Sequence, residues 1–268
     1  PVPQETDLLQ YYQEQYAYDW FEKNVYFKKL QAKHRLFKIR RYLEGAERVL
    51  DFGCGHGFFV EALAGKGYKS YGFDIGADKI MERKHARITN RNRLEEYTET
   101  GFDVITAWHV LEHMRDQDAV LEDLTKRLNP GGKLVIAVPN TGSFGFRYFG
   151  QKWGWTQQPY VHINQFNSAN LQMLLENHGF SIVSVTTTDT WDQNLYDLLI
   201  TYLFYRNKSR NPVRTYGSSV AGNLFFRINQ LARLACTPLS YLVSAIRAGR
   251  KEGNELMVVA QKKIHGDI

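Results

Sequence analysis

One stretch decides the fold of this 268-residue chain: Val49-Leu50-Asp51-Phe52-Gly53-Cys54-Gly55-His56-Gly57. The apolar run that ends at Phe52 predicts a buried strand, and apolar residues recur at helical spacing from Phe58 onward. Three alternate glycines tolerate positive φ and carry no Cβ, so the backbone of this turn can pass close to a ligand. The spacing differs from the G-x-G-x-x-G dinucleotide fingerprint, and Asp51 would place negative charge beside a phosphate. The turn therefore suits a ligand with a cationic or zwitterionic tail.

Three further motifs follow in order along the chain. The apolar stretch 69–74 predicts a second strand that ends in Asp74, and a carboxylate there can accept hydrogen bonds from both hydroxyls of a ribose. A strand predicted over 102–107 runs into Trp108-His109-Val110-Leu111-Glu112-His113. The turn Asn129-Pro130-Gly131-Gly132 then opens a strand that ends near Val138.

In this order and at these distances, the motifs resemble those of class I S-adenosylmethionine-dependent methyltransferases, and most of all the ubiquinone-pathway O-methyltransferases. The resemblance covers roughly residues 30–190 and returns at 254–263. It implies an α/β fold with a doubly wound, mostly parallel seven-stranded sheet, S-adenosyl-L-methionine as cofactor and S-adenosyl-L-homocysteine as product. The third strand should lie near 86–98, where this chain is unusually polar, so the contacts to adenine cannot be placed.

Alternating strands and helices outline the domains. We predict a helical N-terminal cap over 1–45, with Tyr26, Phe27, Leu30, Phe37 and Ile39 as its apolar stripe. The cofactor-binding core covers 46–190 and 254–263, and two insertions interrupt it: an aromatic one at 141–167 and a basic helical one at 191–253. Strands are expected near 47–52, 69–74, 102–107, 132–138, 180–187 and 255–262, and helices near 58–66, 77–87, 117–128 and 168–178.

The resemblance also implies site residues. Those expected to bind the cofactor are Arg35, Asp51, Gly53, Cys54, Gly55, Gly57, Asp74, Ile75, Trp108 and His109. For Arg35, a surface position on a basic helix is the alternative. The aromatic insertion follows the fifth strand, so Phe149, Trp153, Tyr160 and His162 are expected to line the acceptor pocket.

Histidines are the candidate catalytic residues: His162, His109 and His113. A histidine near its ordinary pKa can accept a proton from a hydroxyl group at neutral pH. Loop packing is the alternative role for His162, and a buried structural hydrogen bond is the alternative for His113. In a helix, His109, Glu112 and His113 would share one face, as metal ligands could. Because methyl transfer needs no metal, we expect none.

Charge is unevenly distributed along the chain. The whole sequence carries a net charge of +6, yet residues 198–251 contain nine lysines and arginines and no acid. Aliphatic residues at helical spacing accompany these charges, so the segment is either a peripheral anchor on an anionic membrane or a lid over the substrate. Apolar runs are too short for a membrane-spanning helix, and two cysteines, Cys54 and Cys236, favour free thiols in a reducing compartment. We therefore expect a cytoplasmic protein, peripheral on the inner leaflet if the segment is an anchor.

The predicted reaction is O-methylation of a sugar, a lipid-linked glycan or another envelope or isoprenoid-type small molecule. The fourth strand lacks the Asn/Asp-Pro-Pro-aromatic turn that this class uses for nucleobase N-methylation. The alternative is a cofactor-binding, membrane-surface protein without transferase activity. Nucleic acid is not an expected partner, because the basic segment is also rich in aliphatic residues.

Overall fold

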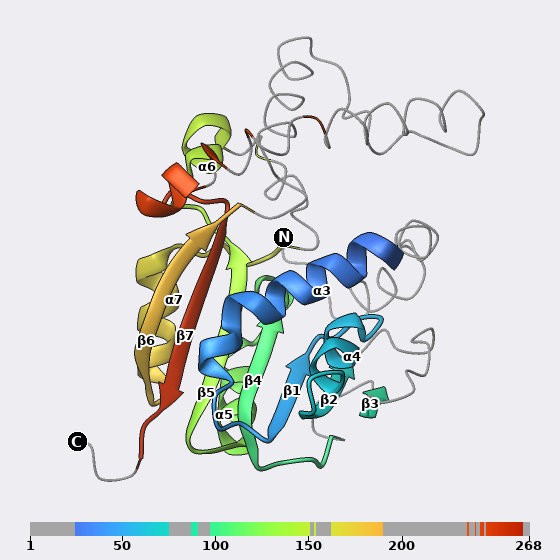
Figure 1. Ribbon diagram of the computed structural model, residues 1–268. Helices are drawn as coiled ribbons and strands as arrows, with labels where there is room; N and C mark the ends of the chain where they lie inside the picture. The colour runs from blue at the N-terminus through green and yellow to red at the C-terminus, as the bar shows by residue number, and fades with distance from the viewer. Residues whose placement is uncertain are drawn as a thin grey trace. The chain divides into compact units, whose positions relative to one another are not determined.

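The computed structural model describes residues 25–74, 87–90, 97–150, 153, 162–189, 235, 239, 242–243 and 245–264. They contain a seven-stranded sheet, shown in Figure 1, with the strand order β3-β2-β1-β4-β5-β7-β6. The strands are β1 (Arg48–Phe52), β2 (Lys69–Asp74), β3 (Arg87–Asn90), β4 (Phe102–Trp108), β5 (Leu128–Pro139), β6 (Phe180–Thr188) and β7 (Glu255–Lys262).

The sheet is mostly parallel. β1 pairs in parallel with β2 and β4, β2 with β3, and β4 with β5. The arrow of β7 runs opposite to that of β6 in Figure 1, so the last strand enters the sheet in reverse. The predicted fold class and number of strands are confirmed, and β3 falls inside the polar stretch expected to hold the third strand.

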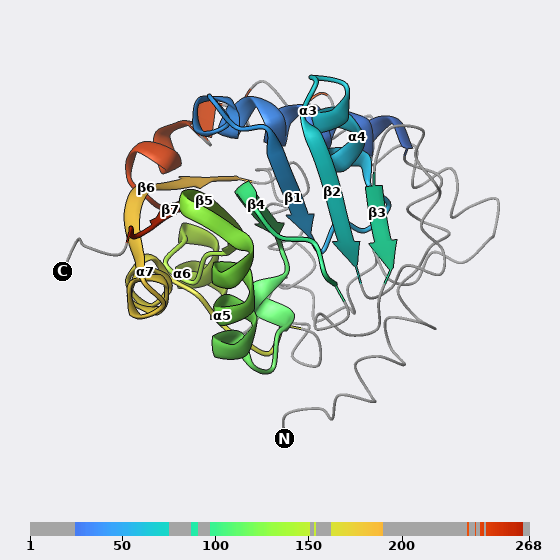
Figure 2. The same cartoon turned by 90° about the horizontal axis from the view of Figure 1, so that it is seen from below.

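Helices cover both faces of the sheet, as Figure 2 shows. The helices α3 (Val25–Ile39) and α4 (Phe58–Ala64) lie on one face, and α5 (Gln117–Arg127) and α7 (Ser168–Asn177) lie on the other. Buried apolar residues fill the first of these layers, among them Ile39, Leu63, Val104 and Val259. This doubly wound arrangement leaves the carboxyl ends of β1, β2 and β4 together at one edge, where parallel α/β sheets bind ligands.

The stretch Asn129-Pro130-Gly131-Gly132 was predicted to be a turn that precedes a strand. This prediction is wrong, because the stretch forms a bulge inside β5. Leu128 is already paired with Phe102, and the pairing resumes at Lys133 opposite Val104. Four residues on β5 therefore face a single residue on β4, and Gly131 accommodates them at φ +72°.

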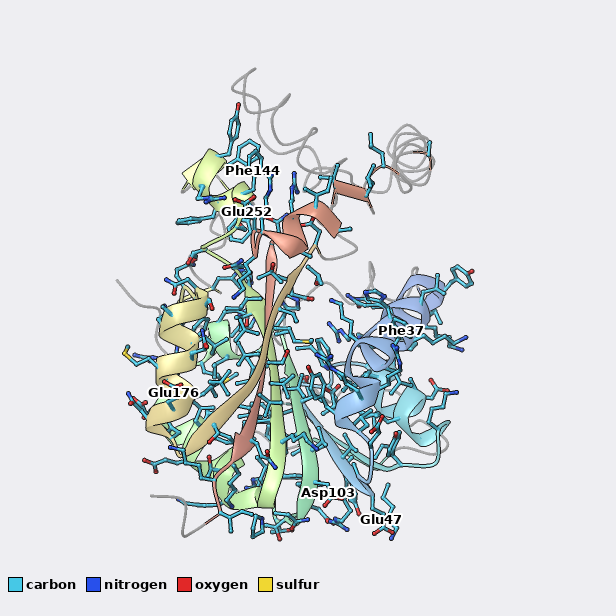
Figure 3. The ribbon with its side chains drawn as sticks, turned by 60° about the vertical axis from the view of Figure 1, so that its left-hand side comes forward. Phe37, Glu47, Asp103, Phe144, Glu176 and Glu252 are labelled. Carbon is cyan, nitrogen blue, oxygen red and sulfur yellow. The ribbon has the colours of Figure 1, made fainter. Side chains whose placement is uncertain are left out.

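The predicted apolar stripe of the N-terminal helix is confirmed at Ile39, which is buried in the core. Tyr26, Leu30 and Phe37 are exposed, and Ala32, which was not part of the predicted stripe, is buried. The helix turns its small and aliphatic residues toward α4, and Arg40 covers the ring of Phe37 on the outer side at 3.9 Å. Figure 3 shows Phe37 pointing outward from α3. The predicted helix over 77–87 lies outside the described residues, apart from Arg87, which begins β3.

The chain forms two compact units. The first contains residues 1–139, 158–185 and 257–268, and the second contains 140–157 and 186–256. The domain boundaries expected from the sequence stay a prediction. Among the described residues, none of the helices is both long enough and apolar enough to span a membrane.

Candidate active site at the carboxyl edge of the sheet

The glycine-rich turn after β1 is bound to the end of β2. The backbone N–H groups of Gly53 and Cys54 donate to the carbonyl oxygen of Phe73, at 2.7 and 3.0 Å. The N–H of Gly55 donates to the carboxylate of Asp74 at 2.7 Å. Strand β1 therefore presents its turn directly beside the acid predicted to bind a ribose. Asp74 remains partly exposed.

The turn also needs glycine for packing. Gly53 has φ +75°, and a Cβ atom at that position would lie 2.3 Å from Cγ2 of Val110, in the segment after β4. Gly57 adopts φ 72° as the N-cap of α4. Any larger residue at Gly53 would push the segments after β1 and β4 apart. Cys54, in the same turn, is a buried free thiol.

Asp51 is a buried carboxyl group just before this turn. The hydroxyl of Thr106 on β4 donates to it at 2.7 Å. Burial raises the pKa of Asp51 to about 7, although the Thr106 hydrogen bond and the charge of Arg35 act in the opposite direction. Near neutral pH, the ionisation of Asp51 therefore depends on the charge of a bound ligand, and a cationic group beside it would favour the ionised form.

Arg35 and Trp108 lie together. The guanidinium carbon of Arg35, on α3, is 4.9 Å from the centre of the Trp108 ring, within the range of a cation–π contact. The Trp108 side chain is buried and packs edge-on against Phe59 of α4 at 5.7 Å. The indole of Trp108 thus contacts Arg35 of α3 and Phe59 of α4. The cofactor contacts predicted for Arg35 and Trp108 stay predictions.

The segment after β4 has a strained backbone. His109 has φ 57°, a left-handed conformation that is uncommon for a residue other than glycine, and its N–H donates to Ala137 of β5 at 2.8 Å. Strain of this kind is retained at functional sites. The expectation that one helix carries His109, Glu112 and His113 on the same face is wrong, because this segment forms only the short 3-10 helix Leu111–His113.

Three histidine side chains gather around Glu112, and we refer to His109, Glu112, His113 and His162 as the Glu112 cluster. His109 Nδ1 lies 3.3 Å from Oε1 of Glu112, and His113 Nε2 lies 3.9 Å from the same oxygen. The rings of His113 and His162 are 4.8 Å apart between centres. Asn164 links the segment that contains His162 to the segment after β4, because its backbone N–H donates to the carbonyl oxygen of Glu112 at 3.0 Å.

Glu112 itself is almost completely buried, with 1% of its surface exposed. Burial opposes its ionisation, but the hydrogen bond from His109 and the nearby rings of His113 and His162 outweigh that effect, so the pKa of Glu112 is lowered. The sequence reasoning did not include Glu112 among the catalytic or binding residues. The available signal was an acid between histidines directly after a strand, His109-Val110-Leu111-Glu112-His113.

The remaining predicted residues lie in the second unit or outside the described residues. Trp153 is a core residue of the second unit, where it packs edge-on against Phe146 at 5.9 Å. Phe149 is half-buried in the same unit and contacts Tyr148. Ile75 and Tyr160 lie outside the described residues. The roles predicted for these four residues stay predictions.

Comparison with known proteins adds the family. A family model described as a methyltransferase domain matches residues 12–185. A curated relative, the ubiquinone biosynthesis O-methyltransferase of Idiomarina loihiensis, is 31% identical over 135 residues, which are 45% of this chain and 56% of that protein. The chain thus spans about half the length of the curated relatives it matches.

Two solved structures share the fold. A SAM-dependent methyltransferase from Archaeoglobus fulgidus has a TM-score of 0.56 at 20% identity, and the match covers 91% of this chain and 100% of that one. A possible histamine N-methyltransferase from Thermotoga maritima has a TM-score of 0.58 at 14% identity, with 95% and 100% covered. At these identities the likeness concerns the fold.

Proposed function

The chain belongs to the methyltransferase domain family, with the fold of class I S-adenosylmethionine-dependent enzymes, and we propose that it transfers a methyl group to a hydroxyl oxygen of a small molecule. The hydrogen bond from Gly55 to Asp74 carries this proposal, because it joins the glycine turn and the ribose-binding acid into one cofactor site. The acceptor we propose is a sugar, a lipid-linked glycan or another envelope or isoprenoid-type molecule. The name of the Idiomarina relative favours an O-linked product.

Each residue of the carboxyl edge has a place in this reaction. Asp74 accepts hydrogen bonds from the ribose hydroxyls, while Asp51 and Arg35 face the charged amino-acid end of the cofactor. The cofactor supplies an activated methyl group on a sulfonium. A new carbon–oxygen bond forms as the carbon–sulfur bond breaks, and the proton of the acceptor hydroxyl passes to a base. The imidazoles of the Glu112 cluster are the bases that we assign to this step.

Calorimetry tests the cofactor site. We expect S-adenosylmethionine and S-adenosylhomocysteine to bind with micromolar-scale affinity, and Asp74→Ala to weaken binding by roughly 1–3 kcal/mol because the ribose hydroxyls lose their acceptor. Absence of binding heat in the unmodified protein would refute the proposed function. Unchanged affinity of the variant would refute only the role of Asp74.

A transfer assay tests the reaction itself. Release of S-adenosylhomocysteine is measured with free sugars, lipid-linked sugars and prenylated phenols as acceptors. Release with a hydroxyl acceptor, and loss of that release when the hydroxyl is blocked, would support O-methylation. Tight cofactor binding without release for any acceptor class would favour a cofactor-binding protein that lacks transferase activity.

We further propose that the second unit binds an anionic membrane surface. Its helical residues Leu239, Leu242 and Ile246 are exposed by 55, 60 and 50%, at the spacing of one helix face. Arg250 and Lys251 follow on the exposed surface, at the end of a segment that has nine positive charges and no acid. Apolar insertion and attraction to anionic lipid favour the same surface.

Vesicle sedimentation tests the membrane proposal. Wild-type protein should sediment with phosphatidylserine-containing vesicles, less so at high salt, and replacement of Leu239, Leu242 and Ile246 by serine should abolish sedimentation. The matched control is Met173→Ser, which removes a 59%-exposed apolar side chain from α7. Equal recovery in the supernatant with and without anionic lipid would refute the proposal.

A further inference from the structure

The Glu112 cluster contains a set of potential metal ligands drawn from two distant parts of the chain. Glu112, His113 and His162 each offer one ligand atom, and these atoms lie within 4.8 Å of one another. Glu112 and His162 are buried, and His113 is half-buried. The geometry therefore combines convergent ligand atoms with partial access from outside.

The donor set indicates the kind of ion. Two imidazole nitrogens and one carboxylate oxygen form a set that suits Zn²⁺ and related divalent transition metals, and three protein ligands are typical of sites that keep one position open. With bonds of about 2.0–2.2 Å, tetrahedral ligand atoms lie roughly 3.3–3.5 Å apart. The 3.9 Å between His113 Nε2 and Glu112 Oε1 is close to that spacing.

The groups around Glu112 can fix the position of its carboxylate, as a metal-binding residue requires. His109 Nδ1 contacts the carboxylate at 3.3 Å and can fix its orientation, as partners of metal ligands commonly do. Asn164 joins the two ligand segments by donating its N–H to Glu112 and its side-chain amide to the carbonyl oxygen of Met114. In the described part of the chain, Glu112 pairs with no lysine or arginine. A buried carboxylate in that setting gains from a cation.

We propose that Glu112, His113 and His162 bind one divalent transition-metal ion, with Zn²⁺ as the ion that best fits the donor set, and that His109 orients Glu112. The fourth position of the ion would take water or, if the proposed function holds, the acceptor hydroxyl, whose proton would then pass more easily to solvent water. A nitrogen that binds the ion cannot also accept this proton, so His113 and His162 act as ligands and not as bases while the ion is bound. This differs from the metal-free reaction expected from the sequence.

Calorimetric titration of the chelator-treated full chain with ZnCl₂, without cofactor or acceptor, tests the proposal. We expect one ion per chain with a dissociation constant in the micromolar range or below. Glu112→Gln and His162→Ala should each weaken binding at least 10-fold. The matched control is His178→Ala, because His178 also lies beside a carboxylate, 3.3 Å from Asp118, but outside the cluster. It should leave zinc binding unchanged.

A second readout separates ligand loss from loss of folding. Co²⁺ should give visible absorption bands typical of a tetrahedral site in the wild type and in the His178 variant, and none in the His162 variant. Circular dichroism at matched temperature confirms that each variant is folded. Zinc binding that is absent from the wild type, or equal in all variants, would overturn the metal site. These titrations contain no cofactor, so they test the metal site alone. If the protein binds zinc but transfers no methyl group to any acceptor, only the proposed function is refuted.

Discussion

Two aspartates on neighbouring strands show how differently the two edges of the sheet treat a carboxyl group. At the amino edge, Asp103 of β4 accepts hydrogen bonds from the N–H groups of Glu47 and Arg48, at 2.8 and 2.9 Å, and from the Asn129 amide at 2.8 Å. Figure 3 shows Asp103 beside Glu47 at this edge. Toward the carboxyl edge, Asp51 of β1 is buried with the hydroxyl of Thr106.

The two surroundings shift the pKa values in opposite directions. Partial burial would raise the pKa of Asp103, but the hydrogen bonds from Arg48, Glu47 and Asn129 lower it. Burial raises the pKa of Asp51 to about 7. Asp103 therefore stabilises the fold as an ionised group, whereas Asp51 costs stability when it ionises, which is consistent with the cofactor-binding role that we propose for it. Functional sites commonly carry such a cost.

The largest expected effect is a pH dependence of stability that differs between these two aspartates. Because the folded pKa of Asp51 is raised from 3.8 to about 7, its contribution to stability is complete below pH 3.8 and is lost as the pH rises through 7. The loss is on the order of 4 kcal/mol at most. Asp51→Asn does not titrate, so its free energy of unfolding relative to wild type should rise between pH 4 and 7.

Urea unfolding at several pH values measures this difference. Asp103→Asn serves as the control of opposite sign. The lowered pKa of Asp103 gives stability that is present above the unfolded pKa and is lost as the pH falls through the folded value. Parallel pH profiles of the two variants would contradict the contrast between the edges.

His162→Ala should lower turnover roughly 100-fold, a typical effect for a lost base or an activating ligand, with little change in cofactor affinity. Its ring lies beside His113 in the Glu112 cluster, and it is not among the residues to which our proposal assigns cofactor binding. Single-turnover kinetics and calorimetry on the same preparation separate the two quantities. A proportional loss of both would indicate damage to folding, and full turnover would exclude His162 from the mechanism.

Asp51→Asn should weaken S-adenosylmethionine binding about 10-fold or more, because a charged hydrogen bond worth about 1.5–3 kcal/mol is replaced by a neutral one. The same variant should be more stable than wild type at pH 8. Calorimetry and thermal melts at that pH test the pair of expectations. A variant that loses both affinity and stability would show that Asp51 is structural.

The smallest effect is expected at the amino edge. Asp103→Asn should destabilise the protein by about 1 kcal/mol, because an amide oxygen accepts the two N–H groups more weakly than a carboxylate does. Cofactor affinity should stay unchanged. Urea unfolding at pH 8 provides the measurement, and a cofactor affinity that falls in parallel would show that the two edges are coupled.

The local parts of this architecture could be predicted from the sequence. The strand that ends at Phe52, the positive-φ glycines and the acid at Asp74 follow from patterns within a few residues. The polar β3 was harder to recognise, because an edge strand with one neighbour needs no continuous apolar run. The bulge before Lys133 depends on the partner strand, which the sequence of β5 does not specify.

The presence of His162 in the Glu112 cluster could not be predicted from sequence spacing, which groups only His109, Glu112 and His113. It requires the left-handed turn at His109 and the hydrogen bond by which Asn164 brings His162 to Glu112. Both are tertiary features, because His162 lies far along the chain from the segment after β4. The sequence supplied the residue types, and the fold supplied their proximity.

The position of β7 has a consequence for how this protein is made and how it can change. β7 lies between β5 and β6, yet it follows β6 in the chain after residues 189–254. During synthesis, β6 emerges before its neighbour β7, so the part of the sheet formed by β1, β2 and β4 can assemble before β6 is paired. Loop-closure entropy grows slowly, by only about 0.6 kcal/mol for each doubling of length. The intervening segment can therefore be lengthened, shortened or exchanged during evolution at little cost to the sheet that it interrupts.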